Sequence, residues 1–454
     1  MSNALARKYN VPGPRYTGYP PVPFWDQSKF DKALWMDSAR RCFTESNIEQ
    51  GVSVHVHLPD PERCCRFRGG PRARSNADGM ERPYIDALGR EWALYSACFG
   101  SPPRVKGLHL GSGAPAFFTP DNLSRLMDSL VEDARITPPF DFSFEACPGS
   151  TTEMHLRAMR AHGFTRLTLD VQDFDPLVQR TIDHIRPFEQ VARTTETARR
   201  LGYTSVGFVL NYGLPRQRLA GIVETMTRAV GIHPDRIAFF GYAHEPHPAT
   251  MERRRYADAE IPRGEQRRAL YEIGRDLLLE SGYLAIGTDH FALETDTLFH
   301  SARIHDLHRD QWGYTPFHTR LSIGLGMAAI SDAWYALAQN ARSLKDYLAQ
   351  VDAGGTGVSR GHQLTHEDLT LRQVILDLMC RYQTRLHDGF DSLDCAADCM
   401  ARLEELSHDG LIEHDQGVLR VTDRGRPFVR NVCMAFDPRL WRHPGHADLL
   451  GDIA

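Results

Sequence analysis

The sequence predicts an α/β fold, a barrel of six parallel strands, whole or partial, that is followed by a mainly helical domain. Between about residues 50 and 290, six short runs rich in β-branched or aromatic residues alternate with amphipathic helical segments. This order is typical of a parallel sheet with right-handed crossovers. No G-x-G-x-x-G motif opens the first helix and no P-loop occurs, which disfavours a nucleotide-binding sheet. Past residue 290 this alternation of strands and helices ends.

Each predicted strand is followed by turn residues, and several of the intervening helices end in glycine, a common C-terminal signal. The predicted strands are 52–58, 105–111, 140–146, 166–172, 205–213 and 236–242. Beyond them come a loop-rich segment, a glycine-punctuated run and mainly helical sequence. We therefore divide the chain into an N-terminal segment (1–48), a barrel (49–295) and a C-terminal cap (296–454).

The last module, residues 401–431, reads as helix, glycine stop, strand, DQG turn, strand and helix. This order resembles a small winged-helix unit. Acidic residues flank the turn and favour a packing role over DNA binding. These residues are Glu404, Glu405, Asp409, Glu413 and Asp415. Nearby, Cys395 and Cys399 share one helical face, a spacing compatible with a metal, although an ordinary helix face is the simpler interpretation.

Composition excludes several classes of partner. A net charge of −5 and a pI near 6.5 give no electrostatic case for nucleic acid or an anionic membrane. No apolar stretch approaches the roughly 20 residues of a membrane span, and the first residues lack a signal-peptide pattern. Nine scattered cysteines indicate a reducing compartment. We expect a cytoplasmic protein.

Ligands of parallel α/β folds bind at the C-terminal ends of the strands. The GSGAP turn (111–115) follows the second predicted strand, where glycines allow close approach of a ligand or simply a tight turn. Glu145 ends the third strand, whose other inward positions we take to be phenylalanines. At the barrel mouth this carboxylate could accept hydrogen bonds from a ligand or form a structural ion pair.

Several motifs together resemble the oxygen-independent coproporphyrinogen III oxidase family. They are GPRYTGYP (13–20), VHVHLPD, GSGAP, FEACPG, LDVQDFDPLVQR, NYGLPRQ, FFGYAH, GTDHFA (287–292) and RNVCMAFD (430–437). The resemblance implies a radical S-adenosylmethionine (SAM) fold. In this family, three cysteines spaced C-x3-C-x2-C hold a [4Fe–4S] cluster that binds SAM. The resulting deoxyadenosyl radical removes hydrogen from two propionates, which lose CO2 and become the vinyl groups of protoporphyrinogen IX.

Alignment of the His-Leu-Pro segment places the three family cysteines at Pro61, Cys65 and Arg68. Only Cys65 is a cysteine. Iron–sulfur clusters are held by thiolates, whereas proline offers no ligand and arginine is a permanent cation. Cys64 is a poor substitute, because adjacent residues of an extended loop project in different directions. We therefore expect no [4Fe–4S] cluster.

The positions that the resemblance assigns to the SAM pocket are changed in part. His55 stands for a tyrosine, His184 for an arginine, and Val209 for an aspartate that would bind ribose hydroxyls. GSGAP, with Ser112, Gly113 and Ala114, replaces GGGTP. The matching residues are Glu145, Gln172, Ala243 and Ile330. These changes make SAM binding doubtful and leave haem or a porphyrin as the expected ligand.

The resemblance assigns other surviving residues to the substrate cavity and its lids. They are Arg15, Tyr16, Tyr19, Tyr242, His244, Asp289, His290 and Tyr314. Arg15 could bind a propionate in bidentate fashion. His244, His290 or Tyr314 could meet a pyrrole or ligate a haem iron, or each histidine could be a hydrogen-bonded structural residue.

Two functions remain. The sequence favours a catalytically inactive family member that binds a porphyrinogen, porphyrin or haem as a carrier, regulator or partner of haem-biosynthesis enzymes. The alternative is an active SAM-dependent coproporphyrinogen III dehydrogenase whose atypical cluster uses Cys64, Cys65 and a remote thiol such as Cys147.

Overall fold

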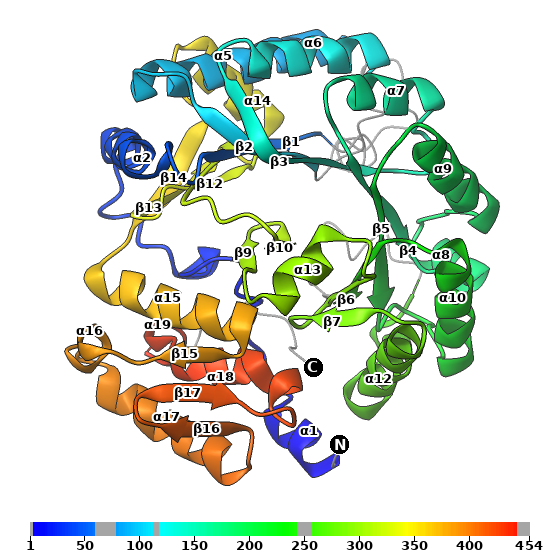
Figure 1. Cartoon of the computed structure of the whole chain (residues 1–454), viewed down its shortest axis with the longest axis vertical. Helices are drawn as coiled ribbons and strands as arrows, with labels where there is room; N and C mark the ends of the chain where they lie inside the picture. Colours follow the sequence, from blue (N-terminus) through cyan, green and yellow to red (C-terminus); the bar gives the residue numbers. More distant parts are fainter. Residues whose placement is uncertain (1–2, 60–78, 112–117, 243–255, 443–454) are drawn as a thin grey trace.

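Six parallel strands form the centre of the protein, as the alternating pattern predicts (Figure 1). The computed structural model describes residues 3–59, 79–111, 118–242 and 256–442. The strands are β1 (Val52–His57), β2 (Arg104–Gly111), β3 (Arg135–Ala146), β4 (Arg166–Gln172), β5 (Ser205–Tyr212) and β6 (Arg236–Gly241). Neighbours in this series pair in parallel. Their curvature in Figure 1 is that of a partial barrel.

Helices cover the outer face of these strands (Figure 1). They are α5 (Glu81–Phe99), α6 (Pro120–Val131), α7 (Glu153–Ala161), α8 (Pro176–Thr181), α9 (Phe188–Arg200), α10 (Leu219–Ile232) and α12 (Gly264–Glu280). Side-chain caps begin several of them: Thr119, Thr152 and Asp175 each accept a hydrogen bond from a first-turn amide, which satisfies donors that lack helical partners.

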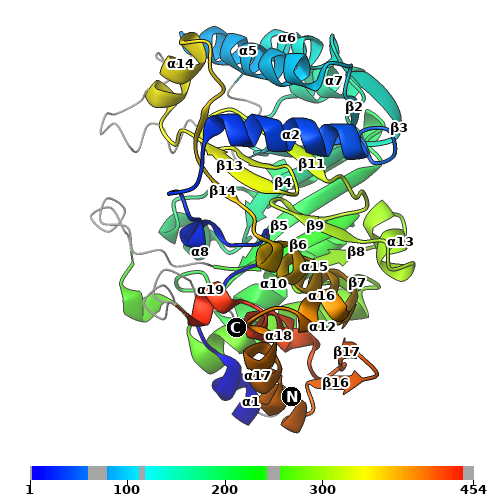
Figure 2. The same ribbon diagram turned by 90° about the vertical axis from the view of Figure 1, so that its left-hand side faces the viewer.

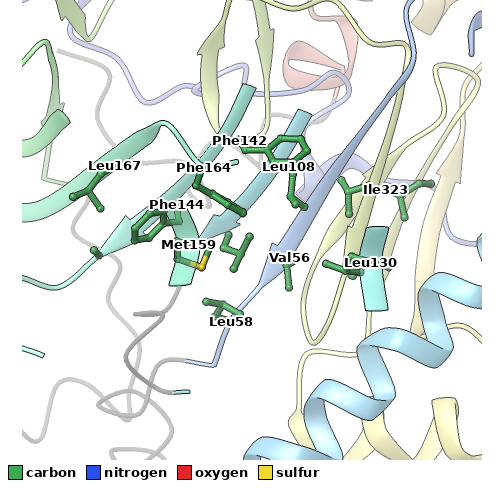
Figure 3. Close-up of a cluster of buried hydrophobic side chains, with 14 of the residues drawn as sticks. Val56, Leu58, Leu108, Leu130, Phe142, Phe144, Met159, Phe164, Leu167 and Ile323 are labelled. Atoms are coloured by element: carbon green, nitrogen blue, oxygen red, sulfur yellow. The ribbon is translucent and has the colours of Figure 1, made fainter. Parts of the chain in front are cut away.

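The core lies between the strands and these helices. Figure 3 shows Val56 of β1 and Phe142 and Phe144 of β3 in one buried cluster with Met159 of α7 and Phe164, which follows that helix. All of these side chains are buried. Burial of each such side chain contributes about 1.5–3 kcal/mol, so this layer holds the strands in place and fixes where their ends lie.

Glu145 faces the opposite side of β3 from the phenylalanines. Phe142 and Phe144 contact Phe164 in the outer core, whereas Ser143 and Glu145 approach His109 inside the barrel. The expectation that phenylalanines share the inward face with Glu145 is therefore wrong, because side chains alternate between the two faces of a strand.

The sheet continues beyond the six strands on both sides. Its order is β14-β13-β12-β11-β1-β2-β3-β4-β5-β6-β8-β7. The added strands are β7 (Leu284–Ile286), β8 (His290–Ala292), β11 (Leu321–Leu325), β12 (Ile330–Asp332), β13 (Ala336–Asn340) and β14 (Val358–Gln363). The sequence pattern does not predict these six added strands. The predicted boundary between residues 295 and 296 remains a prediction.

A buried carboxylate connects helix α5 to these added strands. Glu91 is fully buried, and its oxygens accept hydrogen bonds from Asn340 Nδ2 at 2.9 Å and Tyr347 Oη at 2.8 Å. The amides of Gly326 and Gly357, both 3.0 Å away, also donate to it. Burial raises the pKa of Glu91, while these donors act in the other direction. Helices α2 (Lys32–Ser46) and α14 (Leu344–Asp352) flank this region.

The C-terminal region has the predicted order of helices and strands around a second core. Its elements are α15 (His366–Arg381), β15 (Gln383–Arg385), α16 (Asp388–Asp391), α17 (Ala396–His408), β16 (Ile412–Asp415), β17 (Val418–Val421), α18 (Val429–Ala435) and α19 (Pro438–Trp441). The strands form a small sheet in the order β15-β17-β16. Cys395 and Cys399 are buried in this core, where burial raises the pKa of both thiols.

The N-terminal segment packs on this second core. Helix α1 (Asn3–Tyr9) lies beside α17 and α18 in both views (Figures 1 and 2), and Tyr9 Oη donates to Asp409 at 2.7 Å. Further along, Tyr16 is buried and its hydroxyl donates to Asp437 Oδ2 at 3.0 Å. Residues far apart in the chain thus hold the segment against the second core.

Replacing Asp437 with asparagine should change how stability depends on pH. Burial raises the pKa of Asp437 to about 6, from an ordinary value of 3.8. Below pH 4 this carboxyl is protonated in both the folded and the unfolded chain, so it costs no stability. As the pH rises through 6 the folded state must ionise a buried group, and the free energy of unfolding falls. We expect Asp437→Asn to exceed the wild type in unfolding free energy by about 3 kcal/mol at pH 8 and to match it at pH 4.

Urea unfolding across this pH range tests the expectation. The exposed Asp423→Asn serves as the matched control, since its side chain is 90% accessible. Parallel pH profiles for Asp437→Asn and the wild type would contradict the assignment of a raised pKa to this carboxyl.

Candidate functional site

A short hairpin lies inside the curve of strands (Figure 1). It consists of β9 (His308–Asp310) and β10 (Gly313–Thr315), which pair antiparallel, and it follows α13 (Thr297–Arg303). The hairpin brings Arg309, Asp310, Trp312 and Tyr314 to the inner side of the barrel, where they contact strand residues and the N-terminal segment.

Arg309 joins three separate parts of the chain. It is only 4% exposed. Its Nε donates to the Tyr16 carbonyl at 3.2 Å, and Nη2 lies 3.5 Å from Asp289 Oδ2. The guanidinium carbon lies 4.4 Å from the centroid of the Tyr314 ring. The N-terminal segment, the approach to β8 and the hairpin therefore meet at this side chain.

Asp289 and His290 form the acidic and neutral members of this network. His290 Nδ1 and Asp289 Oδ1 are 2.7 Å apart. Burial alone would raise the pKa of Asp289, but the Arg309 guanidinium and the His290 hydrogen bond outweigh it and hold this pKa well below its usual range. Burial lowers the pKa of His290 despite Asp289. An ionised aspartate beside a neutral imidazole is the resulting state.

Removing the Arg309 charge should destabilise the protein strongly. Arg309→Met leaves the Asp289 carboxylate buried without its cation, a change that typically costs about 3–5 kcal/mol. The loss should be largest above pH 4, where Asp289 is ionised in the wild type, and should shrink at lower pH as the uncompensated carboxyl takes up a proton.

Chemical denaturation of Arg309→Met at pH 3 and pH 8 measures both effects. The exposed Arg303 on α13 supplies the control, and we expect Arg303→Met to lie within about 0.5 kcal/mol of the wild type. Equal stability of the two variants would show that Arg309 is dispensable.

A second inner cluster surrounds His55 on β1. Its ring stacks on Trp312 at 5.6 Å between centroids and lies 6.2 Å from the His109 ring. Within the described residues neither nitrogen of His55 has a hydrogen-bond partner, and Asp310 Oδ2 is 3.7 Å from Nε2. Burial, and then His109, lower the pKa of His55 well below its usual value. The imidazole is therefore neutral and covered by the hairpin.

Polar groups also line the ends of β3, β4 and β5. His184 Nε2 lies 3.3 Å from Asp170 Oδ2, and burial raises the pKa of this aspartate. Gln172 has a left-handed backbone (φ 65°) at the end of β4, and Glu145 ends β3 nearby. Val209 pairs in register with Asp170 and shares its side of the sheet, so it places methyl groups among these polar side chains.

The structure brings several predicted substrate residues together. Arg15 Nη2 donates to the Gly241 carbonyl at 3.1 Å, next to Tyr242, whose hydroxyl contacts that of Tyr256 at 2.7 Å. Asp289 interacts electrostatically with Arg15. The His290 ring meets Tyr314 edge-on at 5.3 Å.

Other predicted residues lie elsewhere or cannot be placed. Tyr16 and Tyr19 belong to the buried C-terminal core, and Ile330 packs beside Trp25. The predicted positions Cys65, Ser112, Gly113, Ala114, Ala243 and His244 lie outside the described residues. The roles assigned to all of these residues remain predictions.

Sequence reasoning missed four residues that the fold places here: Arg267, Arg309, Trp312 and Arg430. Arg430 begins the RNVCMAFD motif that contributes to the resemblance, which is the one signal that could have drawn attention to it. Arg267 and Arg309 lie in helical and loop-rich sequence, where arginine usually indicates a surface position.

Among the described residues, no group of three or more His, Cys, Asp or Glu side chains is arranged to hold a metal ion. Within the same part of the chain, no helix has the length and apolar character needed to cross a membrane. Cys147, one of the free cysteines, follows β3 directly at the barrel mouth.

Comparison with known proteins extends this picture. The model of the radical SAM superfamily matches residues 99–229. The oxygen-independent coproporphyrinogen III oxidase of Escherichia coli K12 is 34% identical over 446 residues, which cover 96% of this chain and 95% of that protein. This chain belongs to the oxygen-independent coproporphyrinogen III oxidase family. The enzymes of Pseudomonas aeruginosa and Helicobacter pylori, each 31% identical, cover 96% and 95% of this chain, and each match spans 95% of the relative.

The family fold agrees with the solved structures. The structure of coproporphyrinogen III oxidase from E. coli, described as a radical SAM enzyme, superposes with a TM-score of 0.85 at 32% identity. The match covers 96% of this chain and 98% of that one. The predicted fold class, a partial six-stranded barrel of radical SAM type with a mainly helical C-terminal region, is thereby confirmed.

Membership of the family corrects the cofactor prediction. The expectation of no [4Fe–4S] cluster, doubtful SAM binding and a haem or porphyrin in their place is wrong, because the chain matches radical SAM proteins over nearly its whole length. The prediction counted thiolates in one aligned loop. A fold gathers ligands from separate segments, and the chain has nine cysteines. Cys147 lies at the mouth, whereas Cys64 and Cys65 lie outside the described residues.

Proposed function

We propose that this family member binds a tetrapyrrole of the coproporphyrinogen class at the barrel mouth, beneath the N-terminal segment. The observation that carries the proposal is the convergence of Arg15, Asp289, His290 and Tyr314 at the ends of β6 and β8. Such a ligand has a broad apolar ring system with carboxylate side chains, so it needs aromatic surface and cations in one place.

Aromatic rings and a cation lie together at these strand ends. The His290 ring lies edge-on between Phe240 and Tyr314, with centroid distances of 5.6 and 5.3 Å. Arg15 is solvent-accessible and uses one donor on the Gly241 carbonyl. The other N–H groups of this planar guanidinium can donate to the carboxylate of a propionate.

We further propose that binding is not followed by turnover. This proposal concerns the chemical step, not the presence of the cofactors. Val209 presents methyl groups where the resemblance implies an aspartate, and the neutral His55, covered by Trp312, stands where it implies a tyrosine. Small errors in the placement of reacting groups cost about a hundredfold in rate. Such a protein would serve in the cytoplasm as a carrier or partner of haem-biosynthesis enzymes.

The second candidate is an active SAM-dependent coproporphyrinogen III dehydrogenase that converts two propionates to vinyl groups. The identity of 34% along nearly the whole chain favours it, as do Glu145 and Gln172, which are retained at the ends of β3 and β4.

Titration with coproporphyrin III, followed by quenching of tryptophan fluorescence, tests tetrapyrrole binding. We expect saturable binding by the wild type and a Kd about tenfold higher for Arg15→Met, because a charge-assisted hydrogen bond contributes about 1.5–3 kcal/mol. The exposed Arg135→Met, on the N-terminal part of β3, controls for loss of charge alone. A wild type that binds no coproporphyrin III contradicts the proposal.

Turnover is tested separately under anoxic conditions, after cluster reconstitution, with coproporphyrinogen III, SAM and a reductant. We expect neither 5′-deoxyadenosine nor vinyl-bearing product above the background without protein, while the E. coli enzyme serves as the positive control. Formation of 5′-deoxyadenosine together with a stoichiometric amount of vinyl-bearing product would contradict the absence of turnover and establish the dehydrogenase.

A further inference from the structure

Arg267 is a buried cation that forms no ion pair with any described residue, and its guanidinium carbon lies 5.6 Å from the centroid of the Tyr212 ring. It lies in the first turns of α12 and is 9% exposed. Its Nε has no hydrogen-bond partner within the described part of the chain. Arginine is seldom buried unless it is paired, because removing a charge from water is costly. An unpaired guanidinium at this depth therefore indicates a missing anionic partner.

Two glycines shape the place that this guanidinium occupies. A Cβ atom on Gly241, at the end of β6, would lie 2.5 Å from Arg267 Nη2 and 2.9 Å from Tyr212 Oη. A Cβ on Gly213, which follows β5, would lie 3.3 Å from Arg267 Cγ, and Gly213 has a φ of 78° that favours glycine. The guanidinium is thus held against the strand ends of the mouth, where a ligand would arrive.

Two further guanidinium groups share this region. Arg15 donates to the carbonyl of the same Gly241. Partial desolvation at the mouth, and then the positive charges of Arg430 and Arg267, lower the pKa of Arg15. Asn431, next to Arg430, donates to the Tyr9 carbonyl at 3.0 Å, so the start of α18 lies against the N-terminal segment that carries Arg15. Arg430, on α18, is half-buried and donates no hydrogen bond to any described residue.

The nearby carboxylate does not neutralise these cations. Asp289 interacts with Arg15 and Arg430, but its oxygens are engaged by His290 at 2.7 Å and Arg309 at 3.5 Å. Arg309 already balances this single negative charge. The region therefore keeps an excess of positive charge from Arg15, Arg267 and Arg430.

We propose that Arg267 and Arg430, together with Arg15, form a carboxylate-binding site that holds a propionate side chain of the tetrapyrrole. This inference rests on the proposed function and deepens it, since it names the part of the ligand that the site recognises. The planar guanidinium fork matches a carboxylate in bidentate geometry, and the elements that carry the three arginines surround the mouth: the N-terminal segment, α12 and α18. Both Arg267 and Arg430 are then specificity-determining residues.

The test compares coproporphyrin III, which carries four carboxylates, with its tetramethyl ester, which carries none. For Arg267→Met and Arg430→Met we expect the Kd for coproporphyrin III to rise about tenfold or more, with the Kd for the ester unchanged. Arg193→Met, an exposed arginine on α9, is the matched control and should bind like the wild type. Unchanged affinity of both variants for coproporphyrin III overturns the inference while leaving the proposed function in place.

A second probe separates the inference from the proposed function. Mellitate, a small aromatic polycarboxylate, should raise the thermal unfolding midpoint of the wild type but not that of Arg267→Met. If the wild type binds no coproporphyrin III yet responds to mellitate through Arg267, the carboxylate site stands and tetrapyrrole binding fails. No response to either compound overturns both.

Stability without ligand provides a control for folding. Arg267→Met removes a buried charge that no described carboxylate balances, so its thermal midpoint should equal or exceed that of the wild type even though the contact with the Tyr212 ring is lost. A midpoint clearly below the wild type would show that Arg267 has a structural role and would overturn its assignment to a ligand. Arg430→Met, at a half-buried position, tests the site even if Arg267→Met fails to fold.

Discussion

The buried guanidinium of Arg309 is the constraint on which the mouth of this barrel depends. It joins the Tyr16 carbonyl, the Asp289 carboxylate and the face of Tyr314. Each group comes from a different segment, and 293 residues separate Arg309 from Tyr16. A point charge would not satisfy these partners as well, because the guanidinium presents several donors in a plane and stacks on a ring. The position of the N-terminal segment therefore follows from the position of the hairpin.

The alternation of side chains explains why the barrel needs this hairpin. The outer faces of the strands bear apolar residues that pack under the helices, as Figure 3 shows. The inner faces bear the polar side chains of His55, His109, Ser143 and Glu145. Trp312 covers His55 and His109, with ring centroids 5.6 and 5.0 Å away. The mouth is thus a polar chamber closed on one side by aromatic surface.

The sequence predicts the strands well because a two-residue alternation and terminal turns are local signals. It misses β12, a strand of three residues that depends on contacts such as the close approach of Gly324 to the Ile330 carbonyl. In the site, the resemblance identified Arg15, Asp289, His290 and Tyr314, which the fold brings together. Arg267 and Arg309 were missed because their burial arises from segments that meet only in three dimensions. The cofactor prediction failed for a related reason, since one loop was judged without the rest of the fold.

The central claim is that a tetrapyrrole lies between the N-terminal segment and the ends of β5 and β6. A crystal structure of the complex with coproporphyrin III tests it most directly. We expect ring density beside His290 and Tyr314, with a propionate on Arg267 and Arg430. Ordered ligand at another face of the protein, with Arg267 still unpaired, would contradict it.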